Sequence, residues 1–480
     1  MEVVSQVPQP TIKCYHSISR SEHYVSGVSG VYGRGSTIQA DDRLYQTFSP
    51  ASRDIAGKNL QSYSFDSSIE NFGGSFSFTI KEDIPDNVFT TTFMDEVEPL
   101  DIVEISENGT ESRVDFIGVV TKVSVGGMSS NLTKTVTVSG RSIEWLFTYF
   151  TINTDIKACI PLNGAANNTF KLDLANENGE KPTAIKDIVV ASLKTFNEYA
   201  AKVNEIDGVE ISNIVIGQII KKWYGDNFSD FVEATDDDFY FPISSNLFDT
   251  GKINVIDFIR KLLPSPIYEI FGFIDDNNKP KLCVRSVPFD NPESTYKIKP
   301  VLLTDFTLTR SCEEVYTAFM PYIEGSSMSP DFYMNLAAAQ AGKEKSYNAS
   351  LSNPDKVKIY GYQLLTCSFV GYSQKSDSPE DEINSTNVKG LTDKMNRWFG
   401  NLDEMYDGDF TLVNIVKDRM AKKGEWIGFA DGLFYVYSES HSWNFGDNPM
   451  INYQVGRGGK WINGEFSRIE KLSAVYREFD

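Results

Sequence analysis

The stretch LFYVYSESHSWNFGDNPMINYQVGRG, residues 433 to 458, alternates in side-chain character over most of its length. In an extended chain, successive side chains point to opposite faces. One face of the first run then carries aromatic and charged residues, namely Tyr435, Tyr437, Glu439, His441 and Trp443. A Gly-Asp pair at 446–447 supplies a turn, and NYQVGRG (452–458) continues as a second run. The stretch therefore predicts a long β-hairpin.

His441 is one of only three histidines in the 480 residues. A general base needs a nucleophile within hydrogen-bond reach and usually an acidic group that orients it. A zinc site needs two or three further His or Cys ligands. The other histidines, His16 and His23, lie near the N-terminus, and the chain has no His-Glu-x-x-His spacing. We therefore interpret His441 as a structural residue packed among its aromatic and charged neighbours, with a position in an interface as the alternative.

The composition limits the class of protein. A chain of this length predicts two to four domains. It is 41% hydrophobic and 13% aromatic, which favours strands or broad interfaces over a helical bundle. Its 45 basic and 66 acidic residues give a net charge of −21, which argues against a surface that grips nucleic-acid phosphates.

The cysteines and the N-terminus indicate folding in a reducing cytoplasm. The five cysteines, with no Cys-x-x-Cys pair, favour neither a disulfide scaffold nor a zinc site. The start MEVVSQVPQPTIK lacks the features of a signal peptide, and no apolar run reaches the length of a membrane span. Two Gly-rich fragments, GVYGRG (30–35) and VGRGGKW (455–461), do not fit the phosphate-loop spacings.

The first half of the chain divides into three parts. Residues 1–52 are rich in Ser, Gly and Tyr, and we expect an irregular N-terminal arm. Residues 53–150 hold five strand-like runs with polar turns and end in a helical SIEWLFTYF, which predicts a small antiparallel barrel or sandwich. Residues 151–250 form a helical insertion with a helix over 181–205. Their acidic block, Glu233 with 236–238, lacks the calcium-loop spacing and is expected to be a solvated loop.

The second half is expected to hold two further parts. Residues 251–300 form a helix-hairpin unit, with a helix at 254–263 and a hairpin turning at Asp-Asp-Asn-Asn (275–278). Residues 301–480 form a second β-rich unit, which three segments interrupt. These are a helix at 331–344, a Ser/Asp/Glu loop at 373–386 and a helix at 391–406.

Three groups of residues together carry a resemblance to a known family. The hairpin YVYSESHSW to NYQVGRG (435–458) looks like the closing hairpin of phage baseplate central hub proteins. YEIFGFIDDNNKPKLCVRSVPF (268–289), followed by TLTRSCEEVYTAFMPYIEG (307–325), is similar to another part of them. The unit from FGGSFSFTI (72–80) to KTVTVSGRSIEWLF (134–147) resembles their opening tube-like domain. The resemblance covers residues 55–150 and 250–460, and leaves the arm and 151–250 uncovered.

The resemblance implies a fold and an assembly. The fold class would be α+β and β-rich, with two tube-like antiparallel β-barrel domains and helical and hairpin insertions. The same fold heads the spike protein of type VI secretion and the tip proteins of non-contractile tails. Three copies would form a homotrimeric ring of six barrels, which joins a hexameric tail tube to a trimeric central spike and lines the channel for genome passage.

The implied partners are the other parts of a tail. They are the central spike protein, the tail tube or tube-initiator protein, the tape measure protein and the baseplate wedge proteins. DNA would pass transiently without specific binding. The protein would be located in the virion, in the tail baseplate, after assembly in the host cytoplasm.

The channel wall can be predicted from its task. A ring around an ejected genome should not retain phosphates, so its inward residues are expected to be polar or acidic and poor in Lys and Arg. The expected carriers are the polar positions of 75–79 (Ser75 to Thr79) and 101–106 (Asp101 to Ser106). The insertion 151–250 is expected outside the barrels, because an insertion between strands is tolerated at a peripheral loop.

We expect a structural protein and no enzyme. A peptidoglycan hydrolase would need two carboxylates in distinct environments or a metal cluster, and neither pattern can be recognised. The sequence therefore predicts no catalytic residue, metal ligand or cofactor site. The alternative is a receptor- or carbohydrate-binding protein at the tip of a non-contractile tail, which the many Tyr, Trp and Phe residues would permit.

Overall fold

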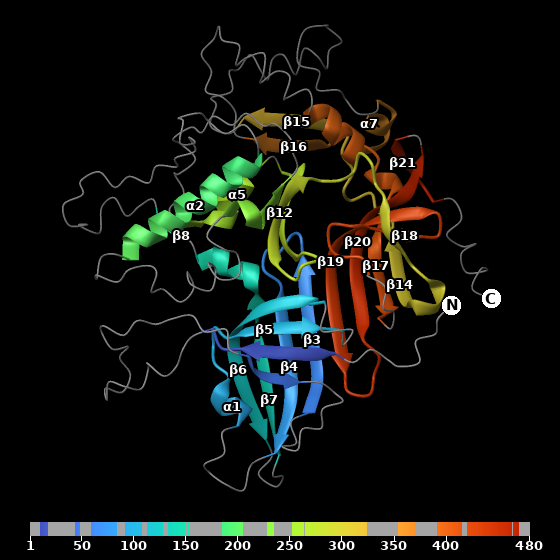
Figure 1. The fold of residues 1–480 in the computed structure, drawn as a ribbon. Helices are drawn as coiled ribbons and strands as arrows, with labels where there is room; N and C mark the ends of the chain where they lie inside the picture. The colour runs from blue at the N-terminus through green and yellow to red at the C-terminus, as the bar shows by residue number, and fades with distance from the viewer. Residues whose placement is uncertain are drawn as a thin grey trace, which may run out of the picture.

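The computed structural model is β-rich, with few helices and one large curled sheet (Figure 1). Fourteen strands belong to this sheet in the part of the chain that the structure describes. That part comprises 10–17, 44–48, 59–83, 92–107, 113–127, 133–149, 151–153, 185–204, 228–234, 252–263, 265–323, 354–369, 391–414, 420–462 and 464–469.

Eight antiparallel neighbours form the main path of the large sheet. In order they are β14 (Leu303–Thr309), β17 (Tyr406–Val413), β20 (Met450–Ile462), β19 (Gly432–Asn444), β3 (Asn59–Ser68), β4 (Ser75–Asp83), β7 (Thr133–Ser142) and β6 (Phe116–Gly127). The hairpin predicted from residues 433–458 is confirmed as β19 and β20. The sequence-distant strands β19 and β3 pair with His441 opposite Phe65 and Trp443 opposite Tyr63.

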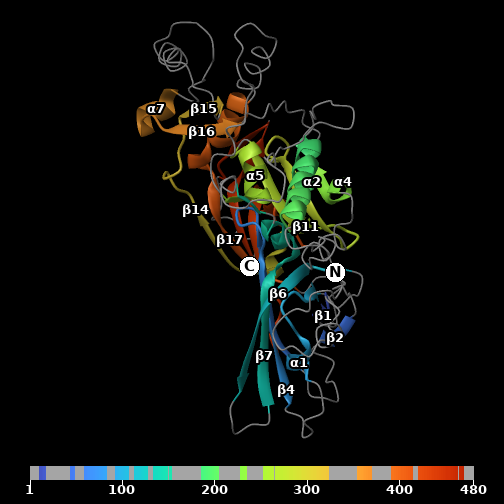
Figure 2. The same ribbon diagram turned by 90° about the vertical axis from the view of Figure 1, so that its left-hand side faces the viewer.

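The N-terminal half of this path has its own core. Three strands continue the sheet past β6: β5 (Ile102–Ser106), β1 (Thr11–Tyr15) and β2 (Leu44–Phe48). Together with α1 (Phe93–Glu96) they lie on one side of β4 and β7 (Figure 2). The Phe side chains of β3 and β4 alternate into the space between these layers, where Phe76 and Phe78 are almost fully buried. Such alternation buries one face of each strand and leaves the other polar.

The segment 1–52 differs from its prediction as an irregular arm. It contains β1 and β2, and β1 pairs with β5 over its whole length. Ile12 and Cys14 alternate inward from β1 and are fully buried. Two buried positions in five residues make a pattern too short to be separated from a loop in the sequence.

The C-terminal half of the path has a second core. Two strands cover it, β13 (Ser294–Lys297) and β18 (Trp426–Phe429), and β21 (Glu465–Ser467) pairs with the end of β20. Phe410 and Phe434 pack edge-to-face with their ring centroids 5.2 Å apart, and both are fully buried. Each half of the sheet thus rests on aromatic side chains from its own strands.

A third core joins helices and two small sheets beside the large one. It contains η2 (Ile143–Tyr149), α2 (Ile185–Asn204), α4 (Phe228–Phe231), α5 (Val255–Leu262), β8 (Thr151–Asn153), β9 (Val232–Ala234), β10 (Lys252–Asn254), β11 (Tyr268–Ile274) and β12 (Pro280–Ser286). The predicted helices over 181–205 and 254–263 and the predicted hairpin are confirmed as α2, α5 and β11–β12. Asn254 caps α5 by accepting a hydrogen bond from the Asp257 N–H.

One end of the molecule carries a separate pair of parallel strands. They are β15 (Ala318–Ile323) and β16 (Leu364–Phe369), with α7 (Pro354–Tyr360) beside them (Figure 1). The predicted helix at 391–406 is present over 391–399 and is followed by η8 (Leu402–Glu404). A further 3-10 turn, η7 (Pro300–Leu302), precedes β14. The predicted helix 331–344 and loop 373–386, and the acidic residues 236–238, lie outside the described residues.

We predict that Gly140 in β7 cannot be enlarged. A Cβ there would lie 2.0 Å from the carbonyl oxygen of Val119 and 2.5 Å from the ring of Phe76. Gly140→Ala should lower the free energy of unfolding by about 1–3 kcal/mol, because the close backbone approach of β6 must open. The matched control is Gly126→Ala in β6, where no heavy atom lies within 4 Å of the added Cβ. Equal urea midpoints for the two variants would contradict this packing.

Candidate functional site: a polar sheet face and its buried joint

One face of the eight-strand path is polar from end to end. Residues directly opposite each other in a sheet project on the same side. A first row crosses the C-terminal half and enters β3 as Asp305, Thr411, Asn452, Ser440 and Asp66. A second row crosses the N-terminal half as Ser64, Ser77, Ser139 and Lys122. We call this surface the polar face.

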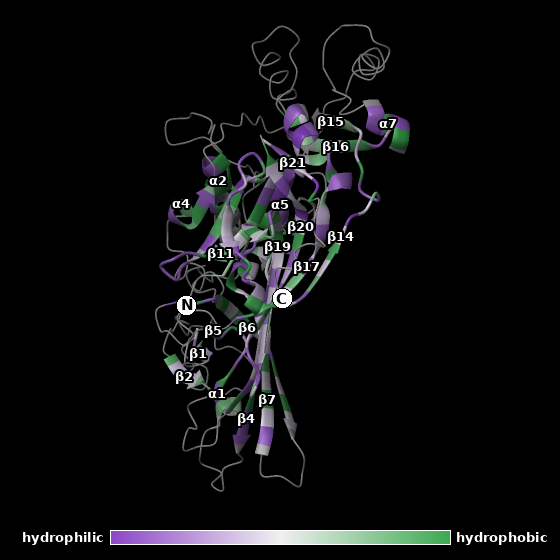
Figure 3. Ribbon diagram, turned by 90° about the vertical axis from the view of Figure 1, so that its right-hand side faces the viewer, coloured by the Kyte–Doolittle hydropathy of each residue, from purple (hydrophilic) through white to green (hydrophobic). Residues whose placement is uncertain are grey.

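Side chains on the polar face are exposed or half-buried and bond to one another across strands. Thr79 and Thr137 share a hydrogen bond of 3.1 Å between their hydroxyls. Ser438 donates to the Gln454 side chain over 2.8 Å, and Asn452 donates to the Thr411 hydroxyl over 3.0 Å. The neighbouring residues of each strand, which alternate to the other side, form the aromatic cores. Figure 3 shows hydrophilic and hydrophobic bands along β7. The face is therefore mostly a field of neutral hydroxyl and amide groups.

Charges on the polar face are segregated. Its acidic side chains lie on β14 and β17, and they are Asp305, Asp407 and Asp409. Its basic side chains lie at the opposite end, on β4, β7 and β6, and they are Lys81, Arg141 and Lys122. Asp66 lies between these groups on β3. Lys and Arg thus lie on the N-terminal half of the polar face.

The two segments expected to supply polar lining behave differently. Ser75, Ser77 and Thr79 all project on the polar face. Asp101 does not, because it is buried and accepts hydrogen bonds from the Tyr45 hydroxyl (3.0 Å) and the backbone N–H of Glu98 (3.1 Å). Glu104 and Ser106 are half-buried on β5, which is not one of the eight strands of the polar face.

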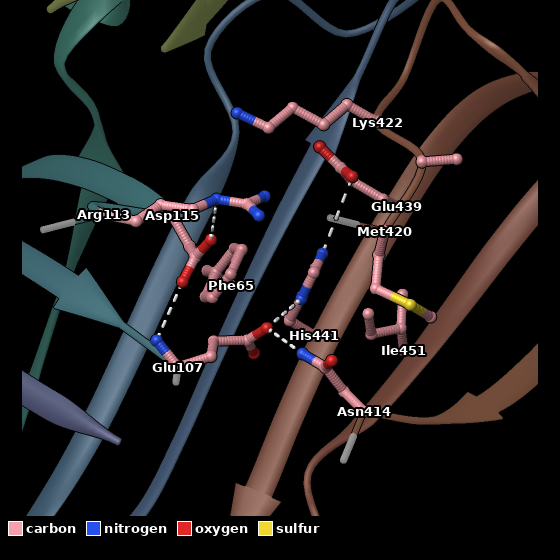
Figure 4. A pocket seen from close by; sticks show the side chains of 11 residues that line it. Phe65, Glu107, Arg113, Asp115, Asn414, Met420, Lys422, Glu439, His441 and Ile451 are labelled. Carbon is pink, nitrogen blue, oxygen red and sulfur yellow. Dashed lines mark hydrogen bonds and ion pairs between the residues drawn. The ribbon is translucent and has the colours of Figure 1, made fainter. Parts of the chain in front are cut away.

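Behind the polar face, His441 sits at the joint between the two halves (Figure 4). Its Nδ1 lies 2.9 Å from Oε2 of Glu107 and its Nε2 lies 3.6 Å from Oε2 of Glu439. Its ring stacks on Phe65 with the centroids 4.3 Å apart. Because Glu107 follows β5 and His441 lies on β19, this contact ties the N-terminal half to the C-terminal half. The prediction that His441 is structural and packed among aromatic and charged groups agrees with this position.

Glu107 is the centre of the buried network around His441. Its Oε1 accepts from the Tyr63 hydroxyl (2.9 Å) and its Oε2 from the Asn414 amide (2.6 Å). Its backbone N–H donates to Asp115 (2.8 Å), whose other oxygen pairs with Arg113 (3.2 Å). Both oxygens of this buried carboxylate therefore accept hydrogen bonds. Sequence reasoning named Glu439 and missed Glu107, Asp115 and Asn414, because no local pattern marks them.

Charges within this network shift the pKa values of its members. Burial opposes the charge of His441. The charge of the Glu107 carboxylate and the hydrogen bonds that the imidazolium donates to Glu107 and Glu439 nevertheless raise its pKa to about 10. Burial also opposes the charge of Glu439, yet the hydrogen bond and the charge of His441 lower its pKa below the ordinary value. Burial and the charge of Glu107 raise the pKa of Asp115. His441 is therefore a cation at neutral pH, held between carboxylates.

A second buried ion pair ties the β11–β12 hairpin to β19. The Nε of Arg285 lies 2.7 Å from Oε1 of Glu269, and the Tyr435 hydroxyl donates to the same carboxylate over 2.6 Å. Burial raises the pKa of Glu269 despite the opposing effect of Arg285. The Arg285 guanidinium also lies 5.4 Å above the ring of Phe271. The first network lines a small pocket together with Phe65 and Met420, and both networks join separate parts of the fold.

Two further observations concern metal binding and membrane crossing. Among the described residues, no group of three or more His, Cys, Asp and Glu side chains is placed to hold a metal ion. None of the described helices combines the length and apolar character needed to cross a membrane.

We predict that His441→Ala destabilises the fold. Removal of the imidazolium leaves Glu107 and Glu439 buried without their cation, which should cost about 3–5 kcal/mol in the free energy of unfolding. The matched control is Ser442→Ala, an exposed neighbour on the same strand, with a change of less than about 0.5 kcal/mol. Chemical denaturation measures both. An unchanged melting temperature together with lost assembly would instead make His441 an interface residue.

The raised pKa of His441 predicts the sign of a pH effect. The folded pKa of about 10 exceeds the unfolded value of about 6.5, so protonation of His441 stabilises the fold fully below pH 6.5. This contribution is lost as the pH rises through 10. The difference in free energy of unfolding between the wild type and His441→Gln should therefore shrink between pH 7 and 10. A constant difference over this range would show that His441 is neutral in the folded protein.

Comparison with known proteins gives matches only among solved structures. No protein-family model and no curated protein matches the sequence. Similar structures include the 43 kDa tail protein of prophage MuSo2 from Shewanella oneidensis, with 9% identity, a TM-score of 0.44, and coverage of 86% of this chain and 95% of that one. A tail protein from Neisseria meningitidis has 11% identity, a TM-score of 0.41, and coverage of 83% and 92%.

A third similar structure comes from a secretion system. It is a component of the Escherichia coli type VI secretion system. This component is structurally similar to T4 bacteriophage tail proteins. It has 7% identity, a TM-score of 0.39, and coverage of 87% of this chain and 78% of that one. These similar structures are tail proteins and a component of a type VI secretion system.

Proposed function

We propose that this chain is a structural component of a phage tail or phage-like contractile injection device, and that it acts as the baseplate hub. The observation that carries the proposal is the polar face, which runs without interruption over eight strands contributed by both halves of the chain. A long polar surface backed by aromatic cores suits the wall of a water-filled channel, because the cores keep the wall rigid while the face stays wet. The resemblance of the sequence to hub proteins points the same way.

The division of the face supports a pseudo-repeated unit. Four strands (β3, β4, β7, β6) rest on one core and four (β14, β17, β20, β19) rest on another. In our proposal these are two tube-like domains, so three chains present six. Such a ring would match a hexameric tail tube on one side and a trimeric central spike on the other. The tape measure and baseplate wedge proteins would be further neighbours in the virion.

The chemistry of the face supports passage of DNA without retention. Each cation in contact with a phosphate adds an attraction through counterion release, and such attractions accumulate around a ring. On this face, hydroxyl and amide side chains outnumber charged ones, and several are already bonded to each other. Its acidic and basic groups lie at opposite ends of the face. A polymer of negative charge would therefore meet neither a strong trap nor a strong barrier.

We predict that added cations convert the polar face into a DNA-binding surface. The variant Ser77→Lys/Ser440→Lys/Gln454→Lys should bind double-stranded DNA more tightly than the wild type. The slope of log affinity against log salt should steepen by about 0.9 for each new phosphate contact. Fluorescence anisotropy over a salt series measures the slope.

The matched control adds the same charge away from the face. Thr47→Lys/Asn277→Lys/Gln363→Lys changes three exposed neutral residues that lie outside the eight strands. An equal gain in DNA affinity for this control would show that net charge alone decides binding, and would contradict a special role for the polar face.

We predict a trimer, either of the purified chain or on contact with the spike or tube protein. Three copies of a two-unit chain are the smallest set that converts threefold to sixfold symmetry. Mass photometry of the chain, alone and with its neighbours, measures the stoichiometry. A stable dimer or tetramer in the assembled particle would contradict the hub assignment.

A further inference from the structure

We propose that a pocket between the N-terminal half, the β11–β12 hairpin and the loop before β18 binds a small zwitterion, an α-amino acid of about the size of glycine. The carboxylate of the ligand lies against Lys423 and its ammonium group against Glu144. We call this space the junction pocket. Such a site is independent of the hub assignment.

The junction pocket adjoins the small pocket around His441. The two pockets share Phe65, Asp115, Lys422 and Glu439 among their lining residues. Figure 4 shows Lys422 and Glu439 in the pocket around His441. The junction pocket therefore extends the buried joint towards the hairpin.

Three parts of the chain complete the lining of the junction pocket. They are the end of β7 with the start of η2 (142–144), part of β11 (272–274) and Lys423 in the loop before β18. Phe116 and Ile117 add to an apolar wall. The space holds roughly three water molecules, which is enough for a ligand without a large side chain. Charge interactions are stronger in a small pocket with apolar walls than in open water.

Lys423 is a buried amine without a direct partner. It is only 5% exposed, and in the part of the chain that the structure describes its Nζ makes neither a hydrogen bond nor an ion pair. The Nζ lies 5.7 Å from the centroid of the Phe271 ring. Burial lowers the pKa of Lys423, and the charges of Glu144 and Glu439 oppose this effect. The amine therefore lacks a hydrogen-bond acceptor, which the carboxylate of a ligand supplies.

Glu144 and Ser142 are two further polar residues whose side chains lack a partner among the described residues. Glu144 is 7% exposed and its carboxyl group makes no hydrogen bond there, while Oγ of Ser142 is buried and unbonded. Gly272 makes room for the Glu144 carboxyl group, since a Cβ at this position would lie 2.6 Å from Cγ and Cδ of Glu144. Buried polar groups are normally hydrogen-bonded. Unbonded groups on several sides of one pocket therefore indicate a ligand.

The charges around the junction pocket favour a zwitterion over a simple ion. The other charged side chains of the pocket already have partners, which are His441 for Glu439, Arg113 for Asp115 and the Ile274 carbonyl for Lys422. An added anion would be attracted by the amine of Lys423 and repelled by Glu144, and an added cation would meet the reverse. A ligand that carries both charges matches both groups, and the Ser142 hydroxyl can donate to its carboxylate.

Isothermal titration calorimetry of the full chain with glycine tests the junction pocket. Glycine should bind with a dissociation constant on the order of 1 mM or below. Acetate and methylammonium each carry one of the two charges of glycine. Each should bind at least about tenfold more weakly than glycine, because one of the two buried groups stays without a partner.

Two variants separate ligand binding from a structural role. Lys423→Met/Glu144→Gln removes both unpaired groups, and it should weaken glycine binding by at least about tenfold. Ser142→Ala removes only the unbonded hydroxyl and should weaken binding by about threefold or more. In the absence of glycine, the melting temperature of either variant should stay the same or rise, because no existing contact is lost. The matched control Lys297→Met/Glu293→Gln makes the same changes at exposed positions and should leave binding unchanged.

Four outcomes would overturn the junction pocket as a ligand site. If about 100 mM glycine gives neither binding heat nor a rise in melting temperature, the pocket holds water alone. If acetate or methylammonium binds as tightly as glycine, one charge is sufficient. Undiminished glycine binding by Lys423→Met/Glu144→Gln would place the site elsewhere. A large fall in the melting temperature of that variant without glycine would make the two residues a structural pair.

Discussion

The contact between the His441 imidazolium and the Glu107 carboxylate holds the two halves of the large sheet in register. Both groups are buried, and the Glu107 carboxylate raises the pKa of His441. A one-residue slip between β19 and β3 would move His441 to the wet face and leave Glu107 without its cation. The polar face depends on this register, because the serines of β19 then lie opposite the polar residues of β3. The residues that the polar face displays are thus determined by a buried interaction behind it.

The two halves are alike in construction and differ in charge. In each, four antiparallel strands present hydroxyl groups on one side and aromatic rings on the other. The acidic end and the basic end of the polar face lie at opposite edges of the sheet. This arrangement differs from a uniformly acidic surface. The net charge of the chain does not predict this separation of charges, because the separation depends on which strands lie at the two ends of the sheet. The polar face is better described as mostly neutral, with charged residues at its two ends.

Local periodicity predicted most strands and little of the joint. The alternation in 75–80 and 433–443 identified β4 and β19, and helical spacing identified α2 and α5. Pairing of β19 with β3 joins residues more than 350 positions apart, and no local signal encodes it. Glu107 was missed for the same reason, since its partners Asn414 and His441 come from the other half. His441 could be excluded from catalysis by the absence of partners, but its cationic state required its neighbours to be known.

Continuity of the backbone ladder between β19 and β3 has a mechanical consequence. Seven residue pairs join these strands, from Ser438 with Ser68 to Asn444 with Ser62. Hydrogen bonds in an antiparallel ladder run perpendicular to the strands. A force along the strand direction therefore loads all of these bonds in shear at the same time, whereas a force across the sheet would open them one after another. The chain is strongest against thrust parallel to its long strands, so an axial impact would be transmitted through both halves as through one stiff plate.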